Sequence, residues 1–89
     1  MKAVVTVVGK DQVGIIASVC MQLASFNVNV LDISQTVMQG YFTMMMVVDV
    51  SASTLPVAEL AKRMEEKGKE MNLSIRLQRE DIFEAMHRV

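Results

Sequence analysis

The segment Gly9–Gly14 holds the residues of this chain whose types and spacing best suit the binding of a ligand. It joins a valine-rich run to a stretch with helical periodicity, so we expect it to lead into the start of a helix. A helix start presents unpaired amides and a partial positive charge, and a glycine there lets a small anion approach the backbone closely. A small carboxylate would therefore fit this loop, although the spacing alone favours the competing interpretation. The competing interpretation is structural: Gly9 ends the strand, Asp11 caps the helix and Gly14 allows tight packing.

The other reactive side chains do not form a catalytic set. His87 is the only histidine and lies close to the end of the chain, which favours a surface position over a role as a base. Cys20 falls on the apolar stripe of a predicted helix, where a cysteine behaves as a small hydrophobic residue. Strand alternation sends Met44 and Met46 to one face and Met45 to the other, so their sulfur atoms cannot converge on a soft metal. The sequence predicts no catalytic residue, no metal site and no cofactor.

Composition limits the remaining classes of function. A net charge of −1 and an aromatic content of 4% disfavour nucleic acid as a partner. Gly9–Gly14 has neither the paired thiolates of a heavy-metal carrier nor the arginine that a small phosphatase would use. The single cysteine excludes an internal disulfide and suits a reducing compartment, and the first apolar run is too short for a signal or a membrane segment. We expect a cytoplasmic protein without a membrane anchor.

Positioning the loop requires an ordered set of strands and helices, and the pattern of apolar residues predicts them. Strands are expected over 2–8, 27–39, 41–50 and 73–78, and helices from residues 13 and 56. Gln39 and Gly40 make the tight turn of a hairpin. The order βαββαβ predicts a ferredoxin-like α+β sandwich, with a four-stranded antiparallel sheet in the order 4-1-3-2 and both helices on one face. We expect one domain, 1–89, with a core over 1–80 and a helical tail over 81–89.

One face of this sheet is left without helices, and its central strands are apolar there. The outward residues are expected to be Val4, Val8, Tyr41, Met45 and Val47. Soluble monomers rarely expose such a strip, so either the tail or another chain should cover it. A domain of 9.9 kDa is small enough to need such help, which predicts a homodimer. The tail residues suited to docking are Ile82, Phe83 and Met86.

Two segments resemble the ACT domain, a regulatory βαββαβ module of amino-acid metabolism. They are Asp11-Gln12-Val13-Gly14-Ile15-Ile16 and Asn27-Val28-Asn29-Val30-Leu31-Asp32-Ile33-Ser34-Gln35. The likeness covers nearly the whole chain and is greatest to small stand-alone ACT proteins, which also have a short terminal segment. Many family members have proline at the position of Val13.

The resemblance implies a non-catalytic homodimer that binds a small effector, often an amino acid, between the first loop of one subunit and the second strand of the other. The matching ligand-binding positions are Asp11, Gln12, Val13, Gly14, Asn27 and Asn29. The alternative is a protein–protein interaction module without a small-molecule ligand, in which the apolar sheet face binds a regulated protein. A small hydrolase that uses the loop to hold an anion is a third possibility.

Overall fold

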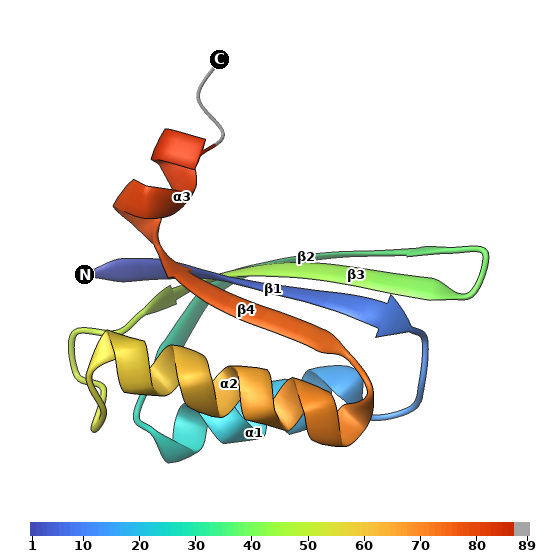
Figure 1. Ribbon diagram of the computed structural model, residues 1–89, viewed down its shortest axis with the longest axis horizontal. Coiled ribbons are helices and arrows are strands. Elements are labelled where there is room, and N and C mark those ends of the chain that lie inside the picture. Colours follow the sequence, from blue (N-terminus) through green and yellow to red (C-terminus); the bar gives the residue numbers. More distant parts are fainter. Residues whose placement is uncertain (87–89) are drawn as a thin grey trace.

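The computed structural model describes residues 1–86, which form four strands and three helices (Figure 1). The strands are β1 (Lys2–Lys10), β2 (Asn29–Met38), β3 (Tyr41–Asp49) and β4 (Ser74–Arg79). The helices are α1 (Ile15–Ser25), α2 (Val57–Met71) and α3 (Glu80–Met86). Each element lies within a few residues of its expected range. β1 continues through Gly9 to Lys10, so the interpretation that Gly9 ends the strand is wrong.

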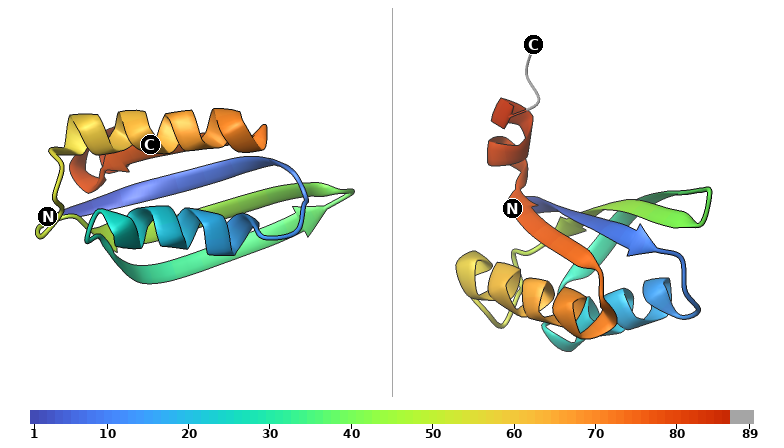
Figure 2. Two further views of the ribbon diagram at one scale, coloured as in Figure 1. Left: turned by 90° about the horizontal axis from the view of Figure 1, so that it is seen from below. Right: turned by 45° about the vertical axis from the view of Figure 1, so that its right-hand side comes forward.

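The four strands form one antiparallel sheet in the order β2-β3-β1-β4, which confirms the predicted ferredoxin-like topology. α1 and α2 lie side by side on one face of the sheet (Figure 2). In this order β2 and β4 are the two edge strands, each paired with a single neighbour. The fold therefore leaves two strand edges open, and these edges differ in the residues around them.

The core lies between the sheet and the two helices. Strand alternation directs every second residue of the central strands toward the helices, and the apolar stripe of each helix meets them. None of the buried residues in the described part of the chain is polar or charged. The largest fully buried side chains are Leu23, Met44, Met46, Leu60 and Met64. Cys20 is partly buried and packs against this core, as the periodicity predicts.

The β2–β3 hairpin has the predicted two-residue turn. Gln39 and Gly40 have φ values of 50° and 81°, the pair of positive angles that suits a turn between twisted antiparallel strands. The turn fixes the register, so Met38 lies opposite Tyr41 and Val37 opposite Phe42. In Figure 1 the hairpin extends beyond the end of the helices. Its tip is consequently exposed on both faces.

The helix-free face of the sheet is only partly covered by the tail. α3 contacts β1 and β4, and Val4 is 6% exposed beside them. Val8, Met45 and Tyr41 remain exposed, Tyr41 at 58%. Phe83 is half-buried while Ile82 is exposed, so within one chain only Phe83 of these two residues is covered, and docking of the tail onto a partner subunit stays a prediction. The side chain of Met86 and the whole of His87 lie outside the described residues.

A forked ion pair holds the start of α3. The guanidinium of Arg79 donates through Nη2 to Asp81 Oδ2 at 2.6 Å and through Nε to Asp81 Oδ1 at 3.1 Å. These hydrogen bonds lower the pKa of Asp81 and raise that of Arg79. The pair links the last residue of β4 to the first turn of α3.

α2 approaches β4 closely at Gly68. A Cβ atom at this position would lie 2.7 Å from the carbonyl oxygen of Leu73 and 3.1 Å from the amide nitrogen of Ile75. No side chain larger than hydrogen fits there without a shift of the backbone. α2 itself begins after Pro56, whose extended ψ of 153° places it just before the first helical residue rather than inside the first turn.

No helix within residues 1–86 has both the length and the apolar character needed to cross a membrane.

Candidate functional site

The loop between β1 and α1 ends at Gly14, which takes the N-cap position of α1. Its φ of 87° lies in the left-handed region that glycine adopts without strain. A Cβ atom there would have no neighbour within 4 Å, so the interpretation that Gly14 allows tight packing is wrong. The predicted capping role of Asp11 is also wrong, because no side-chain hydrogen bond caps α1. The first amides of the helix are therefore not blocked by a capping side chain.

Two hydrogen bonds anchor the loop to different parts of the fold. The backbone N–H of Asp11 donates to the carbonyl of Gly40, in the hairpin turn, at 2.8 Å. The Nε2 of Gln12 donates to the carbonyl of Met71, at the end of α2, at 2.9 Å. The first bond couples the loop to β2 and β3. The second uses one N–H of the Gln12 side-chain amide and ties the loop to the end of α2.

A groove of about 420 Å³ lies between this loop, the start of α1 and the end of β2. Its lining consists of Asp11, Gln12, Gly14, Ile15, Ile16, Ala17, Gln35, Val37 and Phe42. One wall thus has a carboxylate and helix-start amides, and the other is mainly apolar with one amide side chain. Such a lining suits a small molecule that carries a positive and a negative group at one end and an apolar group at the other.

The sequence reasoning missed six groove residues, which are Ile15, Ile16 and Ala17 of α1 and three residues of the hairpin. Gln35, Val37 and Phe42 come from the hairpin, and they reach the loop because the register places Gln35 opposite Met44, Val37 opposite Phe42 and Phe42 opposite Gly9. The two-residue turn at Gln39 and Gly40 was the available signal, since it fixes that register. Val13, a predicted ligand residue, is fully exposed and is not part of the lining.

Asn27 and Asn29 lie at the opposite end of α1 from the loop. The helix has 11 residues, which separates its ends by about 16 Å. Asn27 has a φ of 60° and donates from Nδ2 to the carbonyl of Ala52 at 3.0 Å, which is a structural role. Asn29 begins β2 opposite Asp49. A single chain therefore brings Asp11, Gln12 and Gly14 together and leaves both asparagines away from them.

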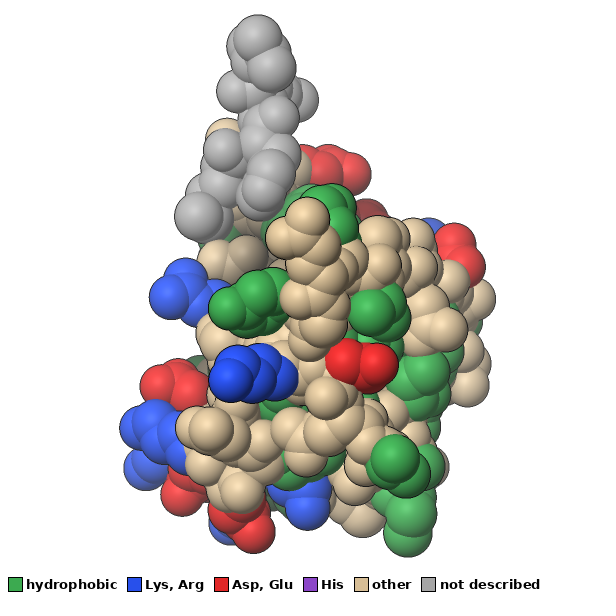
Figure 3. All heavy atoms as spheres, turned by 90° about the vertical axis from the view of Figure 1, so that its right-hand side faces the viewer, with side chains coloured by type: hydrophobic (Ala, Val, Ile, Leu, Met, Phe, Trp, Pro, Cys, Tyr) green, Lys and Arg blue, Asp and Glu red, His purple; other side chains and the backbone are tan. Residues whose placement is uncertain are grey.

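The free edge of β2 borders the groove. All residues from 31 to 38 are exposed, although four of them are large and apolar: Leu31, Ile33, Val37 and Met38. Ile16 of α1 is exposed nearby on the same side of the molecule. Figure 3 shows the molecule from the side of the hairpin tip. In this view hydrophobic side chains gather toward the right, while most charged side chains lie toward the left. The groove is thus open to a second molecule along β2.

The carboxylates whose pKa values are shifted, Asp49 and Asp81, are not part of the groove lining. Hydrogen bonds from the hydroxyl and the backbone amide of Ser51 lower the pKa of Asp49. The amino group of Met1 lies 3.6 Å from Asp49 Oδ1 and adds to this effect. This cluster is at the end of the sheet where β1 begins, whereas the groove is where β1 ends. Within the part of the chain that the structure describes, Asp11 is the only charged residue in the groove lining.

Comparison with known proteins gives consistent matches. The sequence model described as "ACT domain" matches residues 2–78. A UPF0237 protein of Listeria innocua is 51% identical over 89 residues, which are the whole of both chains. The structure of an ACT domain protein from Streptococcus pneumoniae superposes with a TM-score of 0.83 at 45% identity and covers 94% of each chain.

A more distant match has a stated regulatory role. The ligand-free regulatory subunit of aspartate kinase from Thermus thermophilus superposes with a TM-score of 0.66 at 26% identity. The match covers 86% of this chain and 50% of that subunit.

Proposed function

Because the chain belongs to the ACT domain family, we propose that it is a non-catalytic regulatory domain that binds an amino acid at a homodimer interface. ACT domains are regulatory ligand-binding folds found in amino-acid-sensing proteins, and the matched aspartate kinase subunit is itself a regulatory one. The observation that supports this proposal most is the groove, which combines the family's loop with an open strand edge. The proposed location is the cytoplasm, in agreement with a single unpaired cysteine.

The groove offers a partner for each part of an amino acid. The first amides of α1 and its partial positive charge suit the α-carboxylate. The carboxylate of Asp11 suits the ammonium group, because it is exposed and brings a negative charge to the groove lining. Ile16, Val37 and Phe42 offer apolar surface to the ligand side chain. This proposal favours neutral amino acids with apolar side chains over charged ones.

A second copy would complete the site along β2. Two β2 edges related by a twofold axis pair antiparallel, since the same strand then meets itself in the opposite direction. The start of one β2, with Asn29, then approaches the end of the other, where Gln35 and Val37 line the groove. This arrangement would bring Asn29 of the second copy to the β1–α1 loop of the first copy. Within one chain, Asn29 lies too far from that loop to contact it. It would also bury the apolar residues of β2.

The alternative function is a protein–protein interaction module. It is favoured by the helix-free face of the sheet, where Val8, Tyr41 and Met45 remain exposed next to the tail. In that case the β1–α1 loop would be purely structural and no amino acid would bind. Ligand-dependent stabilisation separates the two functions.

Calorimetric titration of the folded protein with each of the common amino acids tests the proposal. A ligand at 100 times its dissociation constant should also add about 2.7 kcal/mol to the free energy of unfolding. Asp11→Asn should weaken binding by roughly tenfold or more, because a charged hydrogen bond contributes about 1.5–3 kcal/mol. The melting temperature of this variant without ligand should match that of the wild type.

Two variants control for indirect effects. Glu66→Gln removes an exposed carboxylate from α2, away from the groove, and should leave binding unchanged. Gly14→Asn introduces a residue type that also tolerates positive φ, and it adds a side chain where the space is open. This variant should therefore fold but bind the amino acid weakly. If no amino acid binds at millimolar concentration, the interaction module becomes the better description.

A further inference from the structure

A second groove, of about 510 Å³, lies on the other side of the molecule between α2 and the free edge of β4. It shares no lining residue with the groove at the β1–α1 loop. α2 contributes Ala61, Glu65 and Lys69, which follow each other at four-residue steps on one stripe. β4 and the residue before it contribute the range 73–78. The loop site and its ligand do not require this groove.

The backbone of β4 is open toward the groove. β4 pairs with β1 alone, over Ser74 to Arg79, so within residues 1–86 no strand lies along its other edge. An unpaired edge of this length is a template for one more strand. The contact at Gly68 closes the space between α2 and β4 at one end, and the small side chain of Ala61 leaves it wider at the other. An extended segment could lie in this space beside β4.

The two faces of such an added strand would meet different surroundings. Ile75 and Leu77 point toward the helix layer and are buried, so that face has an apolar floor. Ser74, Arg76 and Gln78 point to the opposite face. Because side chains alternate along a strand, the added segment would place apolar residues over the floor and polar ones beside Arg76.

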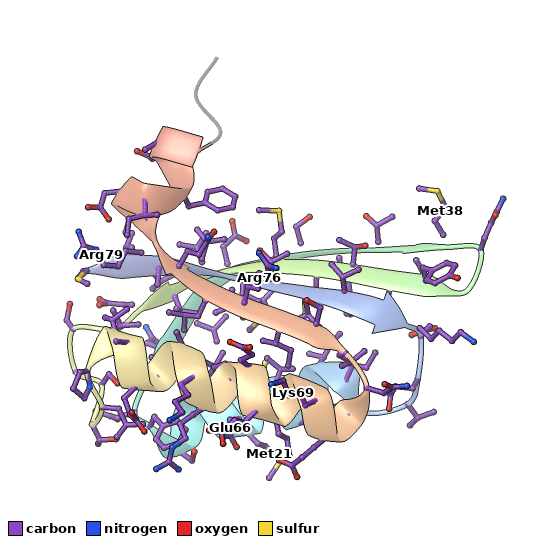
Figure 4. All side chains as sticks on the ribbon, in the orientation of Figure 1. Met21, Met38, Glu66, Lys69, Arg76 and Arg79 are labelled. Carbon is purple, nitrogen blue, oxygen red and sulfur yellow. The ribbon has the colours of Figure 1, made fainter. Side chains whose placement is uncertain are left out.

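Charge distinguishes this groove from the first. Its lining contains two cations, Lys69 and Arg76, and one anion, Glu65. Figure 4 labels both cations and shows that Lys69 comes from α2 and Arg76 from β4. The Nζ of Lys69 lies 4.0 Å from Oε1 of Glu65, and the two side chains form a weak, exposed ion pair. Arg76 has no carboxylate partner within residues 1–86. The net positive lining favours an anionic occupant.

We propose that the groove between α2 and β4 binds an extended acidic segment of another protein, which adds to the sheet as a fifth strand next to β4. Backbone hydrogen bonds to the β4 edge would supply the sequence-independent part of the affinity. Specificity would come from alternation: an acidic residue opposite Arg76, flanked on both sides by apolar residues that contact the floor. A further carboxylate within reach of Lys69 would strengthen binding. This activity adds a partner-binding surface to the ligand-sensing domain proposed above and does not depend on it.

The defined probe is a blocked pentapeptide of alternating glutamate and valine, titrated into the ¹⁵N-labelled protein. Chemical-shift changes should be confined to β4 and the facing stripe of α2. The same peptide with lysine in place of glutamate should bind at least roughly tenfold more weakly, as expected when one charged hydrogen bond becomes a repulsion. A peptide with N-methylated backbone amides should not bind, since it cannot donate to the β4 edge.

Variants on the protein side complete the test. Arg76→Glu should invert the preference between the glutamate and lysine peptides, and Lys69→Glu should weaken binding of the glutamate peptide independently. Lys62→Glu is the matched control, because Lys62 is an exposed cation of α2 outside the groove lining. Equal binding of the two peptides, shifts elsewhere on the protein, or no binding at millimolar concentration would each overturn the proposal. Arg76 would then serve only to keep other strands away from the edge.

Discussion

Replacing Gly68 with alanine tests the closest approach between α2 and the sheet, and the sign of the effect is decisive. In an unhindered helix interior, glycine to alanine stabilises by about 1 kcal/mol, because alanine has the higher helix propensity. Here the new methyl group would lie 2.7 Å from the carbonyl oxygen of Leu73 and 3.0–3.1 Å from two atoms of Ile75. Two of these three atoms belong to the backbone, so they cannot move aside as the end of a side chain can.

Overpacking of this kind costs about 1–3 kcal/mol, so the clash outweighs the gain in propensity. We expect a net loss of about 1 kcal/mol, which lowers the melting temperature by about 4–8 °C in a domain of this size. Thermal unfolding followed by circular dichroism measures the change. The reference pair is Lys62→Gly and Lys62→Ala, at an exposed position inside the same helix, where the alanine variant should be the more stable by about 1 kcal/mol. A Gly68→Ala protein that is stabilised as much as this reference would refute the close packing.

Three further predictions concern the edge, the tail and pH. Val37→Asp should shift the protein from dimer to monomer in light scattering, because it places a charge on the apolar edge of β2; a wild-type mass of 9.9 kDa at micromolar concentration would contradict it. Deleting residues 81–89 should lower the stability by about 1–2 kcal/mol in urea unfolding, since it uncovers Val4, and an unchanged midpoint would show that the tail does not pack there. Arg79 lowers the pKa of Asp81 in the folded state, so the pair stabilises fully above the unfolded value near 3.8 and is lost as pH falls through the folded pKa. Asp81→Asn should therefore lose less stability than the wild type on acidification below pH 4, and parallel curves would refute this.

The topology could be predicted because local patterns and their order agreed. Alternation in the valine- and methionine-rich segments identified the central strands, and the turn at Gln39 and Gly40 identified the hairpin. Once βαββαβ is the order, the position of each strand follows from the fold. The loop at Asp11 to Gly14 could be recognised as a candidate site for the same reason: it connects the first strand to the first helix.

The other half of the groove depends on long-range geometry, which short motifs do not contain. Val37 and Phe42 reach the loop only through sheet register, and Gln12 binds the carbonyl of Met71, 59 residues away in sequence. The N-cap was assigned to Asp11 because its carboxylate is a good acceptor, but the positive φ of Gly14 starts the helix three residues later. The contact of α3 with β1 likewise joins segments that lie far apart in the sequence.

The amide of Asp11 can act as a reporter of the loop. Its hydrogen bond to the Gly40 carbonyl is a contact between two exposed turns, outside the regular ladder of the sheet. Hydrogen exchange at this amide requires that bond to open, so its exchange rate measures how often the loop separates from the hairpin tip. Amides of the core exchange through larger unfolding events and provide an internal reference in the same spectrum. A ligand held by the loop should therefore slow the exchange of this amide, because the loop must release the ligand before that bond can open.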